Sequence, residues 1–337
     1  MGKTFYPEID ILKSSAALVV ILIHVMANYK GVSDTHFLFW DLIHFSVGIF
    51  VFASGFLQGN ATREVKDVKD VLSELYIRFK RIALPYYQYV IICAVILGSL
   101  TSFNEVFKRF TLNFTWDTLT LAGGFGNNWI PRLFMMLSIA YVLLALIKKR
   151  WRSVLPYAYT ACFLITIYLL VISGVSGKGW WMLPGWLVLY LSGFYTVKNY
   201  IKDNLVRLAL FSGILTVVSY IGVLQLGDST SLFGHKYPPD IFFVTYNLFL
   251  TVLFLLLSRW LFGVFKRKKR IMQSFNFLSR TTYEIFFYHL IVMKVYSHFS
   301  LKFGIIIDYL LVASSTILLV WVLDKAKGYI GSKFSKT

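Results

Sequence analysis

The stretch that decides the fold is Ile9–Tyr29, IDILKSSAALVVILIHVMANY. It is long and apolar enough to cross a bilayer, which takes about 20 residues of helix. Lys13 lies near its start and His24 lies eleven residues further on, deep in the apolar run. At about 100° per residue the two side chains share one helix face, about 16 Å apart along the axis. An ionisable group at membrane depth usually marks a functional site, so we predict a functional histidine on a spanning helix.

The whole chain has the composition of a membrane protein. Of its 337 residues, 57% are hydrophobic and 15% charged, and the mean hydropathy is +0.66. A soluble domain carries about 25% charged residues. The apolar residues also come in blocks of about twenty, which is the length of a membrane span. The sequence therefore predicts an all-α, polytopic integral membrane protein, with residues 1–337 forming a single transmembrane domain.

Ten apolar blocks are predicted to span the membrane: 9–29, 38–58, 82–101, 128–147, 153–173, 181–197, 208–226, 240–262, 281–298 and 304–323. If the N-terminus is cytoplasmic, the inner segments hold 26 of the 34 Lys and Arg residues. Cytoplasmic loops carry such an excess of basic residues. Both termini are therefore predicted to be cytoplasmic, with 60–81 as an inner loop and 102–127 and 227–240 as outer loops.

The net charge of +18 follows from the same positive-inside bias, and no nucleic-acid-binding motif accompanies it. Cys93 and Cys162 lie inside apolar blocks and lack metal-ligand spacing, so no metal site is expected. The remaining histidines outside the candidate site lie near span ends, where solvated or capping roles are expected; these are His36, His44, His235 and His298.

Arg78 and Arg81 are three residues apart, just before an apolar block. Two guanidinium groups on one helix face suit phosphate groups arriving from the cytoplasm. Ordinary positive-inside flanking is the alternative explanation. In the preceding span, Ser54–Gly55 permits close approach of either a helix or a ligand.

Two further polar clusters are found, one at the start of a predicted helix and one inside a predicted span. Asn127, Asn128, Trp129 and Arg132 surround a helix entry at Pro131, which helix initiation also explains. The segment YEIFFYHL places three polar residues inside one apolar block and predicts a polar cavity there. These three residues are Glu284, Tyr288 and His289.

Together these residues resemble the membrane acyltransferase-3 family, bacterial integral-membrane enzymes that acylate cell-surface glycans. On its first helix the family carries an arginine and, after ten intervening residues, a histidine. Lys13 and His24 keep this spacing, with lysine in place of arginine. Its serine–glycine–aromatic motif is matched by Ser54–Gly55–Phe56, and its arginine pair by RFKRIALPYY. The entry NNWIPRLF and the late segment IFFYHL are also similar, so the resemblance extends over essentially the whole chain.

The resemblance implies acyl transfer from cytoplasmic acyl-coenzyme A, with acetyl-coenzyme A the expected co-substrate and no tightly bound cofactor. The acceptor would be a hydroxyl of an extracytoplasmic glycan or exopolysaccharide. The protein would act in the bacterial cytoplasmic membrane, alone or with polysaccharide-synthesis machinery. Catalytic roles are expected for His24, Glu284 and His289; coenzyme A binding for Lys13, Arg78, Arg81, Ser54 and Gly55; and acceptor binding for Asn127, Asn128, Trp129, Arg132 and Tyr288.

Two alternatives stay open from the residues. His24 could act as a general base on the acceptor hydroxyl, or it could carry the acyl group itself. The competing function is a carrier or flippase for a lipid-linked glycan, or a polysaccharide exporter, with the charged groups lining a pathway. The absence of internal symmetry in the sequence disfavours a carrier.

Overall fold

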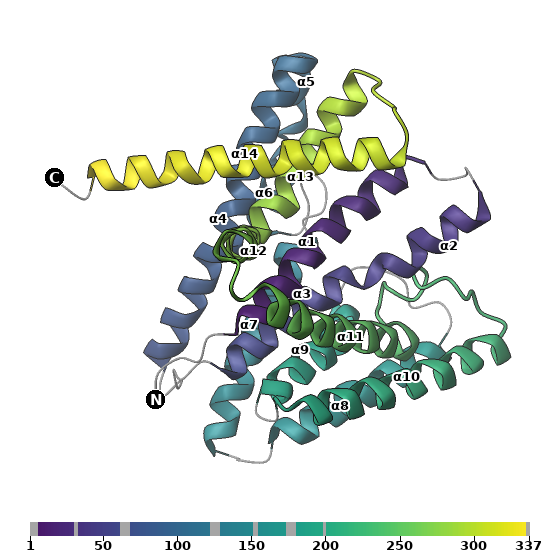
Figure 1. Ribbon diagram of the computed structural model, residues 1–337. Helices are drawn as coiled ribbons and strands as arrows, with labels where there is room; N and C mark the ends of the chain where they lie inside the picture. The colour runs from purple at the N-terminus through teal and green to yellow at the C-terminus, as the bar shows by residue number, and fades with distance from the viewer. Residues whose placement is uncertain are drawn as a thin grey trace.

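The protein is described by a computed structural model over residues 6–29, 33–60, 68–121, 129–150, 154–172, 180–197 and 200–334. These residues form helices and contain no β-strand, as Figure 1 shows. The helices are α1 (Pro7–Ala27), α2 (Asp34–Leu42), η1 (Ile43–Phe45), α3 (Ser46–Gly59), α4 (Val68–Leu100), α5 (Phe103–Arg109), α6 (Leu112–Leu119), α7 (Trp129–Arg150), α8 (Val154–Val171), η2 (Trp180–Met182), α9 (Leu183–Thr196), α10 (Lys202–Gln225), α11 (Ile241–Phe265), α12 (Lys269–Arg280), α13 (Thr282–His298) and α14 (Ile305–Phe334).

Seven segments of these helices are long and apolar enough to cross a membrane: Pro7–Ala27, Asp34–Gly59, Lys69–Leu100, Val154–Val171, Asp203–Gln225, Ile241–Phe265 and Ile305–Tyr329. The other three predicted spans are also helical and correspond to α7, α9 and α13. With 14 residues, α9 is only about 21 Å long, shorter than the roughly 30 Å hydrocarbon core. The all-α polytopic class is confirmed; the number of spans and the side of the termini stay predictions.

Two predicted loops prove to contain helix. The predicted inner loop 60–81 becomes helical at Val68, so that Arg78 and Arg81 lie on α4. Residues 68–81 contain neither glycine nor proline, and half of them are good helix formers. The predicted outer loop 102–127 contains α5 and α6. The arginine pair therefore has the fixed orientation of a helix face.

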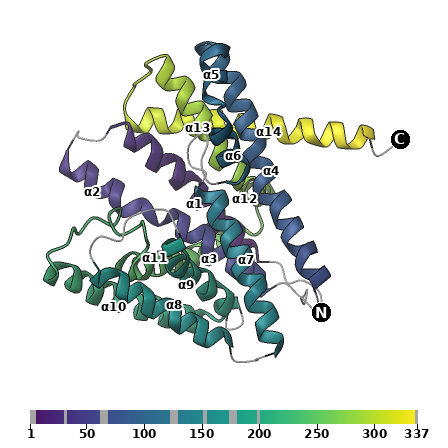
Figure 2. The same ribbon diagram turned by 180° about the vertical axis from the view of Figure 1, so that it is seen from behind.

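The first helix lies at the centre of the bundle. It contacts α3, α11, α12, α13 and α14. In Figures 1 and 2, α8, α9, α10 and α11 gather below it, α13 and the long crosswise α14 lie above, and α4 runs from the bottom of the molecule to its top. Twelve of the residues of α1 are buried. Its polar side chains therefore face protein rather than lipid.

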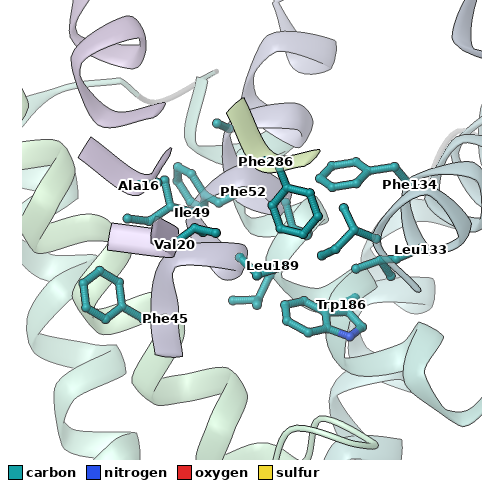
Figure 3. Close-up of a cluster of buried hydrophobic side chains, with 14 of the residues drawn as sticks. Ala16, Val20, Phe45, Ile49, Phe52, Leu133, Phe134, Trp186, Leu189 and Phe286 are labelled. Atoms are coloured by element: carbon teal, nitrogen blue, oxygen red, sulfur yellow. The ribbon is translucent and has the colours of Figure 1, made fainter. Parts of the chain in front are cut away.

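The hydrophobic core joins α1 to helices far away in sequence. Figure 3 shows Ala16 and Val20 of α1 beside Phe45, Ile49 and Phe52. The same cluster continues through side chains of α7, α9 and α13, namely Leu133, Phe134, Trp186, Leu189 and Phe286. Trp186 is fully buried and packs edge-on against Phe243 of α11, with ring centroids 5.7 Å apart. Aromatic packing of this kind fixes the relative positions of the central helices.

The closest approach between helices is made by α3 and α9. A Cβ added to Gly55 would lie 1.8 Å from the backbone oxygen of Tyr190, and one added to Gly193 would lie 2.0 Å from that of Phe52. Two glycines thus bring the backbones together reciprocally, as small residues do in membrane helix pairs. This contact explains why short α9 is held inside the bundle.

We expect Gly55→Ala to destabilise the protein by at least the 1–3 kcal/mol typical of an overpacked core, because the new methyl group would meet a backbone atom. The thermal unfolding midpoint in detergent measures the effect. Gly263→Ala on α11 is the control, since a Cβ there meets nothing within 4 Å. Equal midpoints for the two variants would contradict the reciprocal glycine contact.

Candidate active site

Two predicted catalytic histidines meet inside the bundle. His24 of α1 and His289 of α13 have ring centroids 4.9 Å apart. His289 is completely buried, whereas His24 keeps some accessible surface. The chain brings them together because α1 and α13 are packed side by side. The interior thus holds a pair of imidazoles, of which only that of His24 keeps accessible surface.

Hydrogen bonds fix the tautomer of each ring. His24 Nδ1 lies 2.9 Å from the Val20 carbonyl oxygen, and His289 Nδ1 lies 3.0 Å from that of Ile285. A carbonyl oxygen only accepts, so Nδ1 carries the proton in both residues. In the neutral form the basic lone pair is therefore on Nε2. The Nε2 of His289 has no hydrogen-bond partner among the residues described.

A third histidine joins this pair: His44 was predicted to have a solvated or capping role near a span end, and its burial rules out the solvated role. His44 is only 3% exposed, and its Nδ1 donates to the Trp40 carbonyl oxygen over 2.8 Å. It interacts electrostatically with His24. The reason for its burial is that η1 continues directly into α3, so that His44 lies within a long helical segment rather than at its end.

The fourth member of the cluster is Lys236, which comes from the predicted outer loop 227–240. Its side chain is buried, and its charge acts on both His24 and His44. The ammonium nitrogen lies 5.2 Å from the ring centroid of Trp129 and 5.2 Å from that of Tyr237. Cation–π attraction holds a desolvated ammonium in such a position. Trp129, a predicted acceptor-binding residue, is thus placed beside a cation near His24.

The loop that carries Lys236 is fixed by a buried carboxylate. Asp41 accepts hydrogen bonds from the backbone N–H groups of Leu232 and Phe233, at 2.7 and 2.8 Å, and from the Ser231 hydroxyl at 3.0 Å. The loop also packs tightly on α9, where a Cβ on Gly185 would lie 2.4 Å from the Pro239 oxygen. Lys236 therefore occupies a fixed position.

His235, for which a solvated or capping role was predicted, is also buried, so that the solvated role is wrong. Its Nδ1 contacts the Asp240 carboxylate and its Nε2 contacts the Ser229 carbonyl oxygen. Both partners are acceptors, so both ring nitrogens carry protons and the imidazole is cationic. Burial lowers the pKa of His235, but the hydrogen bond and charge of Asp240 raise it more, and the net shift is upward.

The end of α1 nearer the N-terminus carries a separate polar network. Lys13 Nζ donates to the Ser279 carbonyl oxygen at 2.8 Å and to its hydroxyl at 3.1 Å, and that hydroxyl donates to Asp10 at 2.6 Å. Ser14 donates to the Phe275 carbonyl oxygen at 2.9 Å. Lys13, a predicted coenzyme A ligand, thus binds the last turn of α12, where unpaired carbonyl oxygens attract cations.

The two predicted phosphate-binding arginines differ in their surroundings. Arg78 donates to Gln58 of α3, lies 3.6 Å from the Glu74 carboxylate and stacks on Tyr141 with its guanidinium 5.3 Å from the ring centroid. Arg81 is exposed, and its charge acts on Lys13. Arg78 is therefore held by contacts on α3, α4 and α7, whereas Arg81 is exposed and acts on Lys13 through its charge.

The other predicted site residues that the structure describes lie on α3, α7 and α13. Glu284 lies 3.6 Å from Lys327 of α14, and the buried Tyr288 interacts with Glu284. Gly55 packs on α9, with Ser54 partly exposed beside it. Arg132 is half-buried on α7, and Asn127 and Asn128 lie outside the described residues.

Sequence reasoning missed His44 and Lys236 as members of this cluster. Lys236 is one of only eight basic residues not assigned to the inner segments. The available signal was this lysine in a predicted outer loop, directly before Tyr237 and the Pro238–Pro239 turn. Nothing local in the sequence indicates that the loop folds inward.

The described part of the chain is thus a helical bundle with a buried cluster of bases near one end of α1 and Lys13 near the other. A family model for an acyltransferase domain matches residues 6–325. The chain belongs to this acyltransferase-3 family, and the recognition made from the sequence is confirmed. It is a membrane-integral acyltransferase. No curated protein and no solved structure matches the chain.

The cationic state of His235 predicts a pH-dependent stability. Its folded-state pKa lies above its ordinary value, so its contribution is complete below about pH 6.5 and is lost as the pH rises through the folded pKa. The difference in unfolding midpoint between wild type and His235→Gln should therefore be larger at pH 6 than at pH 9. His298→Gln, at an exposed histidine, should show no such change. An equal difference at both pH values for His235→Gln would contradict the ion pair.

Proposed function

We propose that the protein transfers an acyl group, most simply acetyl, from cytoplasmic acyl-coenzyme A to a hydroxyl of an extracytoplasmic glycan. The observation that carries the proposal is the buried pair of His24 and His289 with both Nδ1 atoms bound to carbonyl oxygens. In that tautomer the neutral Nε2 of His24 is a base that can accept the proton of a hydroxyl. Acceptors on a cell-surface glycan are proposed from the family resemblance.

The arrangement of charge supports coenzyme A as the donor. Lys13 lies near the start of α1, the helix that carries His24, and the charge of Arg81 on α4 acts on it. Coenzyme A has phosphate groups at one end and the thioester at the end of a long arm. Binding the phosphates at these cations would point the thioester along α1 toward His24, about 16 Å further on. A cytoplasmic donor site and an outer acceptor would then meet at the imidazole.

His24→Ala and His24→Gln should both lower acyl transfer by about 10²–10⁴-fold, the usual contribution of a general base. Glutamine can donate a hydrogen bond to Val20 but cannot cycle a proton. Release of free coenzyme A by purified protein, with glycan acylation in cells, measures the loss, while calorimetry measures acyl-coenzyme A binding, which should be retained. His298→Gln is the control. Normal transfer by a well-folded His24→Gln variant would refute the proposed role.

Arg81→Ala should weaken acyl-coenzyme A binding by about 1.5–3 kcal/mol, the value of a hydrogen bond to a charged group, and leave stability unchanged because the side chain is exposed. Arg78→Ala should lower both affinity and stability, since Arg78 also holds α3 and α4 together. Lys80→Ala is the matched control, because Lys80 lies on Tyr76 on the same helix. If Lys80→Ala and Arg81→Ala weaken binding equally, the pair serves only as a basic flank.

A further inference from the structure

The cluster around His24 contains several bases and one strong donor. His44 repeats the pattern of His24 and His289, with Nδ1 donating to a carbonyl oxygen, so the neutral Nε2 of all three rings is an acceptor. Trp40, which packs edge-on against His44, already donates its indole N–H to the Ile23 carbonyl oxygen at 3.0 Å. Lys236 acts electrostatically on His24 and on His44, and its ammonium group donates hydrogen bonds and accepts none.

Acyl transfer needs such a donor. When an oxygen nucleophile adds to a thioester carbonyl, the carbonyl π electrons move onto oxygen and form an oxyanion. Donors already in place stabilise that charge, and they do so most strongly where water is excluded. A base alone does not stabilise the oxyanion. The site therefore also needs a cation or an N–H group that can reach the carbonyl oxygen.

We infer that Lys236 is a catalytic residue whose ammonium binds the oxyanion during acyl transfer; this inference rests on the proposed function. The acceptor hydroxyl gives its proton to His24 Nε2 and its oxygen bonds to the thioester carbon. The carbonyl oxygen becomes an oxyanion that accepts a hydrogen bond from Lys236. Collapse re-forms the C=O bond and breaks the C–S bond, and the departing thiolate takes the proton from His24.

The surroundings of Lys236 suit that role. The aromatic faces of Trp129 and Tyr237 attract the ammonium without neutralising its charge. Asp41 holds the loop through three hydrogen bonds, and the side chain is 6% exposed. The charge therefore lies in a fixed, desolvated position near the base, where preorganisation is most effective.

Lys236→Met tests the inference, because methionine keeps an unbranched apolar stem against the two rings and removes the charge. Both acyl transfer to glycan and hydrolysis of acyl-coenzyme A pass through the oxyanion, so kcat for both should fall by about 10²–10³-fold. The affinity for acyl-coenzyme A should stay within about twofold, since Lys236 lies away from the proposed phosphate site. Lys236→Arg should recover part of the activity, and Lys302→Met, at an exposed lysine, should match wild type.

The outcomes separate the inference from the proposed function. Wild type that consumes no acyl-coenzyme A with any glycan refutes the proposed function and this inference with it. If wild type is active and Lys236→Met loses only affinity for the glycan, with hydrolysis unchanged, Lys236 binds the acceptor and the inference is wrong. If Lys236→Met fails to fold, Lys236→Gln is used, and hydrolysis by that variant at the wild-type rate is the overturning result.

Discussion

The polar side chains of α1 lie inside a helical bundle, where each must find a partner within the protein. An unpaired polar group in an apolar interior costs several kcal/mol. Lys13 donates hydrogen bonds to the carbonyl and hydroxyl oxygens of Ser279, in the last turn of α12. His24 donates to the Val20 carbonyl oxygen on its own helix. Lys13 contacts Ser279 and His24 contacts His289, so α12 and α13 follow α1 in the same chain direction.

The same constraint sets the chemistry of the histidines. A ring whose Nδ1 donates one turn back along its own helix must leave its basic nitrogen on the opposite edge, facing the neighbouring helix. His24, His44 and His289 all satisfy their Nδ1 atoms in this way. His235 does not, since both of its nitrogens face acceptors and it becomes part of an ion pair. One residue type thus supplies bases inside the bundle and a structural cation in the loop.

The sequence predicts those parts of the site that depend on a single helix. The spacing of Lys13 and His24, and that of Arg78 and Arg81, is fixed by helix geometry alone. Gly55 was ambiguous, because close approach by a helix and by a ligand require the same small residue, and only the contact with Tyr190 assigns it to helix packing. Lys236 could not be placed at all, since its burial depends on Asp41, nearly two hundred residues earlier in the chain.

This division also suits the proposed function, in which one helix serves a donor and an acceptor that come from opposite sides of the membrane. The cations near Lys13 and the bases near His24 are held apart by the rigid spacing of α1, whereas the parts that complete each end come from other elements: α4 and α12 at one end, α13 and the loop of Lys236 at the other. A carrier would have to expose these groups alternately to each side, so its central helix would have to change partners. Here α1 is packed against several helices and is hydrogen-bonded to α12 near its start; just beyond its end, Tyr29 is hydrogen-bonded to Asp308 of α14. A fixed central helix suits a site to which two substrates come from opposite sides.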